Sequence, residues 1–188
     1  LRGLGQEQGL FFPDEIPQLE DVEALLELDF IPRSVAILKP FVDDVISTDT
    51  LREMLTQAFN FPLPLLHIGT ENNICALELF HGPSLAFKDF GARFLAQCFD
   101  EFGCQQAVIE DPENESITPQ QPLTILTATS GDTGAAVAHA FYGMENIRVV
   151  ILYPHGKITT LQEKLFSTLG GNIHTISIAA DFDSCQQL

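Results

Sequence analysis

One lysine has neighbours that suit a chemical role. Lys88 follows the string His-Gly-Pro-Ser-Leu-Ala-Phe at residues 81–87 and begins a predicted helix, with Phe87 and Phe90 on either side of it. A helix N-terminus carries positive partial charge and phenylalanines remove water, and both effects favour the neutral amine. Because a neutral amine is the nucleophile of Schiff-base chemistry, Lys88 is a candidate catalytic residue. The alternative is a surface lysine that pairs with the adjacent Asp89.

A polar turn between a predicted strand and a predicted helix is the second candidate site. Its central residues are Ser130, Gly131, Asp132 and Thr133, within the string Thr-Ala-Thr-Ser-Gly-Asp-Thr-Gly at 127–134. Open parallel sheets bind ligands at the carboxyl ends of their strands, where such a turn offers backbone N–H groups and hydroxyls. The turn therefore predicts a site for an anion, either a carboxylate or a phosphate. The alternative is ordinary N-capping of the following helix by one of these side chains.

The histidines and cysteines do not predict a metal site. The five histidines show no ligand spacing, and the four cysteines include no Cys-x-x-Cys pair. The histidines are expected to have structural roles, and this includes His81, which lies in the turn before Lys88. Cys75 and Cys98 fall on apolar stretches, so we expect both to be buried. Reduced thiols predict a cytoplasmic protein.

Composition narrows the class of protein. The chain has 188 residues, 45% of them hydrophobic, and a formal net charge of −17. The hydrophobic fraction predicts a globular fold with a real core. The excess of acidic residues argues against nucleic-acid binding, which needs clustered Lys and Arg. No apolar run approaches the roughly 20 residues of a membrane-spanning helix, so no membrane partner is expected.

The first part of the chain is predicted to be mostly helical. Residues 1–18 form an irregular arm whose apolar trio, Leu10 to Phe12, should insert into another part of the protein. Three helices follow: one from Val22 to Phe30 that Pro32 ends, one over 33–42 that stops near Pro40, and one that begins with a capping box of Thr50 and Glu53.

The rest of the chain is predicted to form a hairpin first and then an alternation of strands and helices. A turn at Asn72-Asn73 precedes a strand over 74–80, a helix from Lys88 ends at Gly103, and residues 110–122 form an acidic loop. A buried strand is predicted at 123–128 and further strands at 147–153 and 173–179, with helices at 134–142, 160–169 (capped by Thr160 and Glu163) and 181–188. The alternation predicts an α/β fold, in which a mostly helical N-terminal region precedes a βαβ parallel-sheet unit.

Two long strings carry a resemblance to a known family. Residues 78–91 (Glu-Leu-Phe-His-Gly-Pro-Ser-Leu-Ala-Phe-Lys-Asp-Phe-Gly) and 126–136 (Leu-Thr-Ala-Thr-Ser-Gly-Asp-Thr-Gly-Ala-Ala) resemble threonine synthases. Shorter similar strings occur at 8–13, 149–154, 161–165 and 170–172. The resemblance extends over nearly the whole chain and corresponds to the N-terminal portion of such an enzyme. It implies a pyridoxal-phosphate phospho-lyase of fold type II, the tryptophan-synthase-β group. In threonine biosynthesis, a branch of the aspartate family, that enzyme converts O-phospho-L-homoserine and water to L-threonine and phosphate.

The resemblance also implies roles for particular residues. Lys88 matches the lysine that holds pyridoxal phosphate covalently and then moves protons on the substrate, and Phe87 lies beside it in the cofactor pocket. Ser130, Gly131, Asp132 and Thr133 match the loop that borders the cofactor ring and receives the substrate carboxylate. Many members of the wider fold group have Asn at the position of Asp132.

The predicted organisation has three segments. These are an N-terminal arm with helices (1–72), a segment with the lysine helix and the acidic loop (73–121), and a parallel βαβ unit (122–188). In the fold group, the groups that hold the cofactor phosphate and the pyridine nitrogen come later in the sequence, so we expect the 188-residue chain alone to be inactive. Two alternatives stay open. One is another pyridoxal-phosphate lyase or deaminase of the same fold group, and the other is a non-catalytic protein that binds an anion at Thr129–Gly134.

Overall fold

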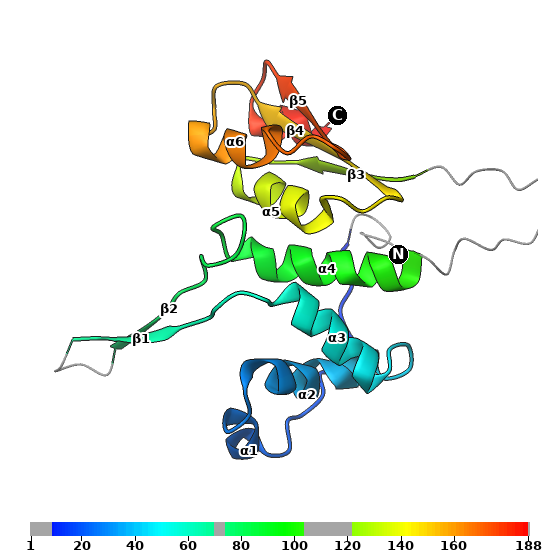
Figure 1. The fold of residues 1–188 in the computed structure, drawn as a ribbon, viewed down its shortest axis with the longest axis vertical. Coiled ribbons are helices and arrows are strands. Elements are labelled where there is room, and N and C mark those ends of the chain that lie inside the picture. The colour runs from blue at the N-terminus through cyan, green and yellow to red at the C-terminus, as the bar shows by residue number, and fades with distance from the viewer. Residues whose placement is uncertain (1–8, 70–73, 104–121, 188) are drawn as a thin grey trace, which may run out of the picture. The chain divides into compact units, whose positions relative to one another are not determined.

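The computed structural model describes residues 9–69, 74–103 and 122–187. The chain divides into two compact units, Leu1–Thr56 and Gln57–Leu188 (Figure 1). The three-segment division predicted from the sequence stays a prediction. The asparagine turn and nearly all of the acidic loop lie outside the described residues. Among the described residues, no helix is both long and apolar enough to cross a membrane.

The first unit begins with a helix that is shorter than predicted. Helix α1 is Val22–Leu26 and α2 is Phe30–Val42, so the helix predicted to reach Phe30 ends four residues earlier. The reason is Arg33, whose guanidinium donates hydrogen bonds to the Leu25 and Leu26 carbonyls at 2.9 and 2.8 Å. These bonds satisfy carbonyls that have no partner at the end of a helix, and they stabilise the turn into α2.

Both prolines that were expected to end helices lie inside α2. Pro32 is the third residue of the helix, where the N–H that proline lacks would have no partner within the helix. Pro40 lies two residues before the last residue of α2, where it removes one helical hydrogen bond, the one that its missing N–H would have donated to the Ala36 carbonyl. The stop predicted at Pro32 is therefore wrong, because proline is tolerated in the first turn of a helix, whereas the helix predicted over 33–42 ends at Val42 as expected.

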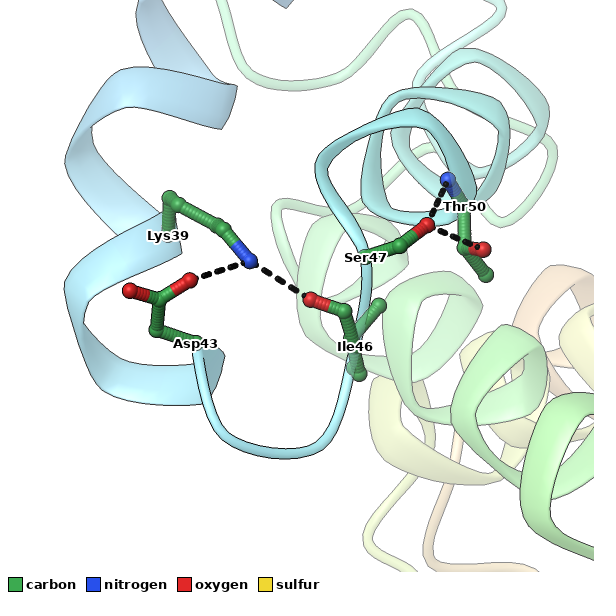
Figure 2. A network of polar contacts seen from close by, with 5 residues as sticks. All are labelled: Lys39, Asp43, Ile46, Ser47 and Thr50. Carbon is green, nitrogen blue, oxygen red and sulfur yellow. Dashed lines mark hydrogen bonds and ion pairs between the residues drawn. The ribbon is translucent and has the colours of Figure 1, made fainter.

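Helix α3, Thr48–Ala58, is capped by Ser47 and not by the predicted Thr50–Glu53 box. The Ser47 Oγ accepts a hydrogen bond from the Thr50 N–H at 3.1 Å (Figure 2). The loop before it is closed by Lys39, which donates to the Ile46 carbonyl at 2.7 Å and pairs with Asp43. The apolar residues of α3 that repeat at helical spacing are all buried: Leu51, Met54, Leu55 and Ala58.

The apolar trio of the N-terminal arm is exposed. Leu10, Phe11 and Phe12 have exposed fractions of 73%, 62% and 80%. The insertion predicted for the trio therefore does not occur within the part of the chain that the structure describes.

The second unit contains a two-stranded antiparallel hairpin. Strands β1 (Leu65–Ile68) and β2 (Ile74–Leu77) pair along their whole length, and the predicted strand over 74–80 ends at Leu77. Cys75, predicted to be buried, is exposed, since no third strand covers it among the described residues. Cys98, the other cysteine predicted to be buried, is half-buried. Burial raises the pKa of its thiol.

The predicted parallel sheet is confirmed, and with it the α/β class. Its described strands are β3 (Leu123–Ala128), β4 (Ile147–Pro154) and β5 (Ile173–Ile178), paired in parallel in the order β3-β4-β5. The helices of this part are α4 (Lys88–Gly103), α5 (Asp132–Phe141), α6 (Thr160–Ser167) and α7 (Phe182–Gln187). In Figure 1, α5 (yellow-green) lies between α4 and the sheet.

The core of this unit forms around the central strand. Val149 and Ile151 of β4 are fully buried, together with Phe141 and Phe166 of the neighbouring helices. Strand β3 has only one neighbour in the described sheet, and none of its residues is buried, which corrects the prediction of a buried strand. Helix α4 joins the same core, where the rings of Phe99 and Phe141 meet at 5.6 Å between their centroids.

Candidate functional site

The polar turn after β3 is built around one buried hydroxyl. Thr129 is 1% exposed, and its Oγ1 accepts hydrogen bonds from the N–H groups of Gly131 and Gly134 at 2.9 and 2.8 Å. Its own N–H donates to the Leu152 carbonyl at 2.9 Å, which anchors the turn to the central strand. One of the hydroxyls that the sequence offered for binding is therefore used to hold the turn in shape.

Two positions of the turn require glycine. Gly131 has φ +138°, and a Cβ at this position would lie 2.6 Å from the carboxamide carbon of Gln162. A Cβ on Gly134 would lie 2.5 Å from Cγ2 of Thr129. The first position combines a backbone conformation that favours glycine with close packing against α6. The absence of a side chain at Gly134 lets α5 approach the end of β3.

Ser130, Asp132 and Thr133 do not cap α5, so the capping alternative is wrong. Gly131 is the N-cap residue and has no side chain to cap the helix, and the Gly134 N–H in the first turn donates to Oγ1 of Thr129. Ser130, Asp132 and Thr133 are exposed. No hydrogen bond is described in which the N–H of Asp132 or Thr133 donates to another described residue. The start of α5 therefore presents exposed donors at the carboxyl edge of the sheet, where a carboxylate or phosphate would be stabilised.

The turn before Lys88 is held in place by Asp89, the residue that follows the lysine. Asp89 is completely buried, and its Oδ2 accepts a hydrogen bond from the Ser84 N–H at 2.9 Å. Gly82 packs so closely that a Cβ there would lie 2.3 Å from the same oxygen. Leu85, between these residues, has φ +60°, which is unusual for a residue with a side chain. Asp89 therefore holds residues 82–88 in place, and it is not the partner of Lys88 that the surface alternative required.

Lys88 begins α4, as predicted, and its side chain reaches the polar turn. The Nζ atom lies 4.0 Å from Oδ2 of Asp132 and 4.6 Å from the centroid of the Phe87 ring. The removal of water predicted around the amine is only partial, because the Lys88 side chain is 34% exposed and Phe87 is 60% exposed. Phe90 packs against Phe59 and Phe61. The structure thus brings the two candidate sites together.

The ion pair between Lys88 and Asp132 is weak. Both side chains are more than a third accessible, and pairs of this kind contribute about 0–1 kcal/mol to stability. The contact therefore orients the amine and leaves it free to move.

Sequence reasoning missed Gln162, which contacts the turn from α6. Its Nε2 donates a hydrogen bond to Oδ1 of Asp132 at 2.8 Å. Gln162 also forms a capping box with Thr159, one residue before the predicted box of Thr160 and Glu163. The signal was present as a Thr-x-x-Gln pattern before an apolar stretch, which is a capping box as valid as the one predicted.

Three histidines have polar partners other than Lys88: His81 pairs with Glu78 at 2.6 Å, His67 contacts Cys75, and His155 contacts Ser177. Burial lowers the pKa of His139 on α5, an effect opposed by the charge of Asp89 and a hydrogen bond at the Leu165 backbone. Within the described ranges, no group of three His, Cys, Asp or Glu side chains could hold a metal ion.

Comparison with known proteins agrees with this architecture. A family model described as "Threonine synthase N terminus" matches residues 1–59. The threonine synthase of Haemophilus influenzae is 57% identical over 187 residues, which cover 100% of this chain and 40% of that protein. The threonine synthase of Escherichia coli is 53% identical over 189 residues, with the same coverage.

Solved structures give the same result. The crystal structure of the Escherichia coli threonine synthase superimposes with a TM-score of 0.82 at 52% identity, and it covers 98% of this chain and 40% of that one. A PLP-bound threonine synthase from Brucella melitensis superimposes with a TM-score of 0.79 at 33% identity, covering 98% and 38%. The predicted resemblance to the N-terminal portion of threonine synthases is confirmed. The chain spans about two fifths of the length of these relatives.

Proposed function

We propose that this chain is the N-terminal part of a threonine synthase, a pyridoxal-phosphate-dependent phospho-lyase of fold type II. The reaction proposed is the conversion of O-phospho-L-homoserine and water to L-threonine and phosphate. The observation that carries the proposal is the approach of the Lys88 amine to the Ser130–Thr133 turn, with Nζ 4.0 Å from the Asp132 carboxylate. The names of the similar proteins, and the PLP bound to one of them, support it.

The residues of the site fit pyridoxal phosphate. The cofactor carries an aldehyde, with which a primary amine such as that of Lys88 can condense. Once bound, it would supply an electron sink for negative charge that develops on the substrate carbons. Phe87, whose ring lies 4.6 Å from the amine, offers an apolar surface to the cofactor ring. The exposed hydroxyls of Ser130 and Thr133 offer polar contacts at its edge.

The chain's own groups have two tasks in this mechanism. The N–H groups of Asp132 and Thr133, at the positive end of α5, bind the substrate carboxylate and fix the orientation of the amino acid. The Lys88 amine, on its flexible stem, removes and returns protons at the α and β carbons of the substrate. Its weak pairing with Asp132 gives it a defined resting position.

The proposal is tested on the full-length protein that contains this chain. Incubation with O-phospho-L-homoserine should release phosphate and L-threonine in equal amounts. Borohydride reduction of the protein with pyridoxal phosphate should leave a covalent pyridoxyl group on the peptide that carries Lys88. Lys88→Ala should abolish both signals, and Lys157→Ala, a change at an exposed lysine, should preserve both.

The same experiment separates the alternatives. Another lyase or deaminase of the fold group would label Lys88 but release no threonine from this substrate. A non-catalytic anion-binding protein would give neither signal. We further propose that the 188-residue chain alone is inactive, since it spans only about two fifths of its relatives, and that the protein acts in the cytoplasm.

A further inference from the structure

The two carboxylate oxygens of Asp132 have different partners. Oδ2 faces the Lys88 amine at 4.0 Å, and Oδ1 accepts a hydrogen bond from Gln162 Nε2 at 2.8 Å. Gln162 comes from α6, so three helices meet at this one carboxylate. An exposed aspartate side chain rotates freely unless something holds it, and the Gln162 hydrogen bond is the contact that does so.

The orientation of the Gln162 carboxamide is determined by its own neighbours. Its Oε1 accepts hydrogen bonds from the N–H of Thr159 at 3.1 Å and from the Thr159 hydroxyl at 2.9 Å. The opposite orientation would place an NH₂ group against the Thr159 N–H and an oxygen against the Asp132 carboxylate. Only one orientation therefore satisfies both ends, and it directs the NH₂ group at Asp132.

Close packing adds to this constraint. The backbone of Gly131 lies so near the Gln162 carboxamide that a Cβ at residue 131 would be 2.6 Å from the carboxamide carbon. The start of α6 and the turn before α5 are thus in direct contact. Through this contact, Gln162 fixes the position of the turn relative to α6.

We propose that Gln162 is a positioning residue that holds the Asp132 carboxylate so that Oδ2 remains beside the Lys88 amine. The inference rests on the proposed function, because it assigns Gln162 an effect on the lysine that reacts. It acts through Asp132, and it does not itself touch the substrate.

The test compares Gln162→Leu, Asp132→Asn and the double variant in the full-length enzyme. Gln162→Leu should lower kcat about tenfold, the scale expected when a group that positions a reacting residue is lost. The kcat of the double variant should lie within about twofold of the kcat of Asp132→Asn, because the two residues act as one unit. If the two losses multiply in the double variant, or if Gln162→Leu turns over like the wild type, the inference is wrong.

Thr159→Ala is the matched control. It removes the hydroxyl of the capping box, but the Thr159 N–H still donates to Gln162 Oε1 and Nε2 still reaches Asp132, so it should lose thermal stability, as Gln162→Leu does, but retain kcat. An equal loss of kcat in both variants would assign the effect to the capping box and overturn the proposal. Gln186→Leu, at an exposed glutamine of α7, controls for the substitution itself.

A crystal structure supplies a readout that does not depend on the reaction. In the cofactor-free full-length protein with Gln162→Leu, Asp132 should rotate, and the distance from its carboxylate to Lys88 Nζ should exceed 4.0 Å. An unchanged Asp132 would overturn the inference even in an active enzyme. A wild-type enzyme with no threonine synthase activity would instead contradict the proposed function, while this structural comparison would still decide the role of Gln162.

Discussion

The Nζ atom of Lys88 lies 4.0 Å from Oδ2 of Asp132, although one residue begins α4 and the other begins α5. Each helix start is shaped by a buried group beside it, Asp89 in the first case and Thr129 in the second. The Lys88 amine and the exposed turn are therefore held by two rigid supports.

Asp89→Ala should destabilise the full-length protein by about 1–3 kcal/mol, because the Ser84 N–H would lose its acceptor in a buried position. It should also reduce borohydride labelling of Lys88 by pyridoxal phosphate, since the turn before the lysine would relax. Thermal unfolding and peptide mass spectrometry measure the two effects. Asp100→Ala, at an exposed position of the same helix, is the control, and equal behaviour of the two variants would contradict the role of Asp89.

Thr129→Val should cost about 1–3 kcal/mol for each N–H group it leaves unpaired, here those of Gly131 and Gly134. The shape of the side chain is nearly unchanged, so packing is preserved and the loss reports the hydroxyl alone. Thr129→Ser retains the hydroxyl and should recover most of the stability. The measurement is the melting temperature of the full-length protein, and a serine variant no better than the valine variant would refute the assignment.

Gly131→Ala should impair cofactor binding and turnover, because the new Cβ would collide with the Gln162 carboxamide in a backbone conformation that disfavours alanine. Gly156→Ala is a suitable comparison. Gly156 also has a positive φ, of +66°, but no described atom lies within 4 Å of a Cβ placed there. The affinity for pyridoxal phosphate and kcat should fall in the first variant and change little in the second, and similar losses in both would assign the effect to φ alone.

His139 should titrate below the usual imidazole value of about 6.5. Burial lowers its pKa, with the charge of Arg93 acting in the same direction and that of Asp89 acting against both. Because the pKa is lower in the folded than in the unfolded state, protonation favours unfolding. The neutral His139 thus contributes stability that is present above about pH 6.5 and lost as the pH falls through the folded pKa.

The check on His139 is hydrogen–deuterium exchange at the imidazole C–H, followed by mass spectrometry across pH 5–8. The exposed His174 in the same digest provides the reference. A midpoint for His139 at or above the usual value would contradict the expected effect of burial.

The local sequence determined most of the elements of the sheet region. Strand β3 has the predicted bounds, Leu123–Ala128, and the other strands and helices of this region differ by at most two residues at nearly every end. Such features depend on side-chain periodicity and turn chemistry, which act over a few residues. Errors arose where two neighbouring residues could each cap the same helix. Ser47 caps α3 in place of the predicted Thr50, and Thr159 caps α6 in place of the predicted Thr160.

Burial and long-range contacts were decided only by the tertiary structure. Cys75 lies on an apolar segment yet is exposed, because burial depends on what another part of the protein places over it. The family resemblance brought Lys88 and the 130–133 turn into one predicted site, but the sequence did not predict their contact. Nor did it predict Gln162, which reaches Asp132 because α6 packs beside α5. Hydrogen bonds between side chains distant in sequence form where the chain crossovers bring helix ends together, and no short segment records that geometry.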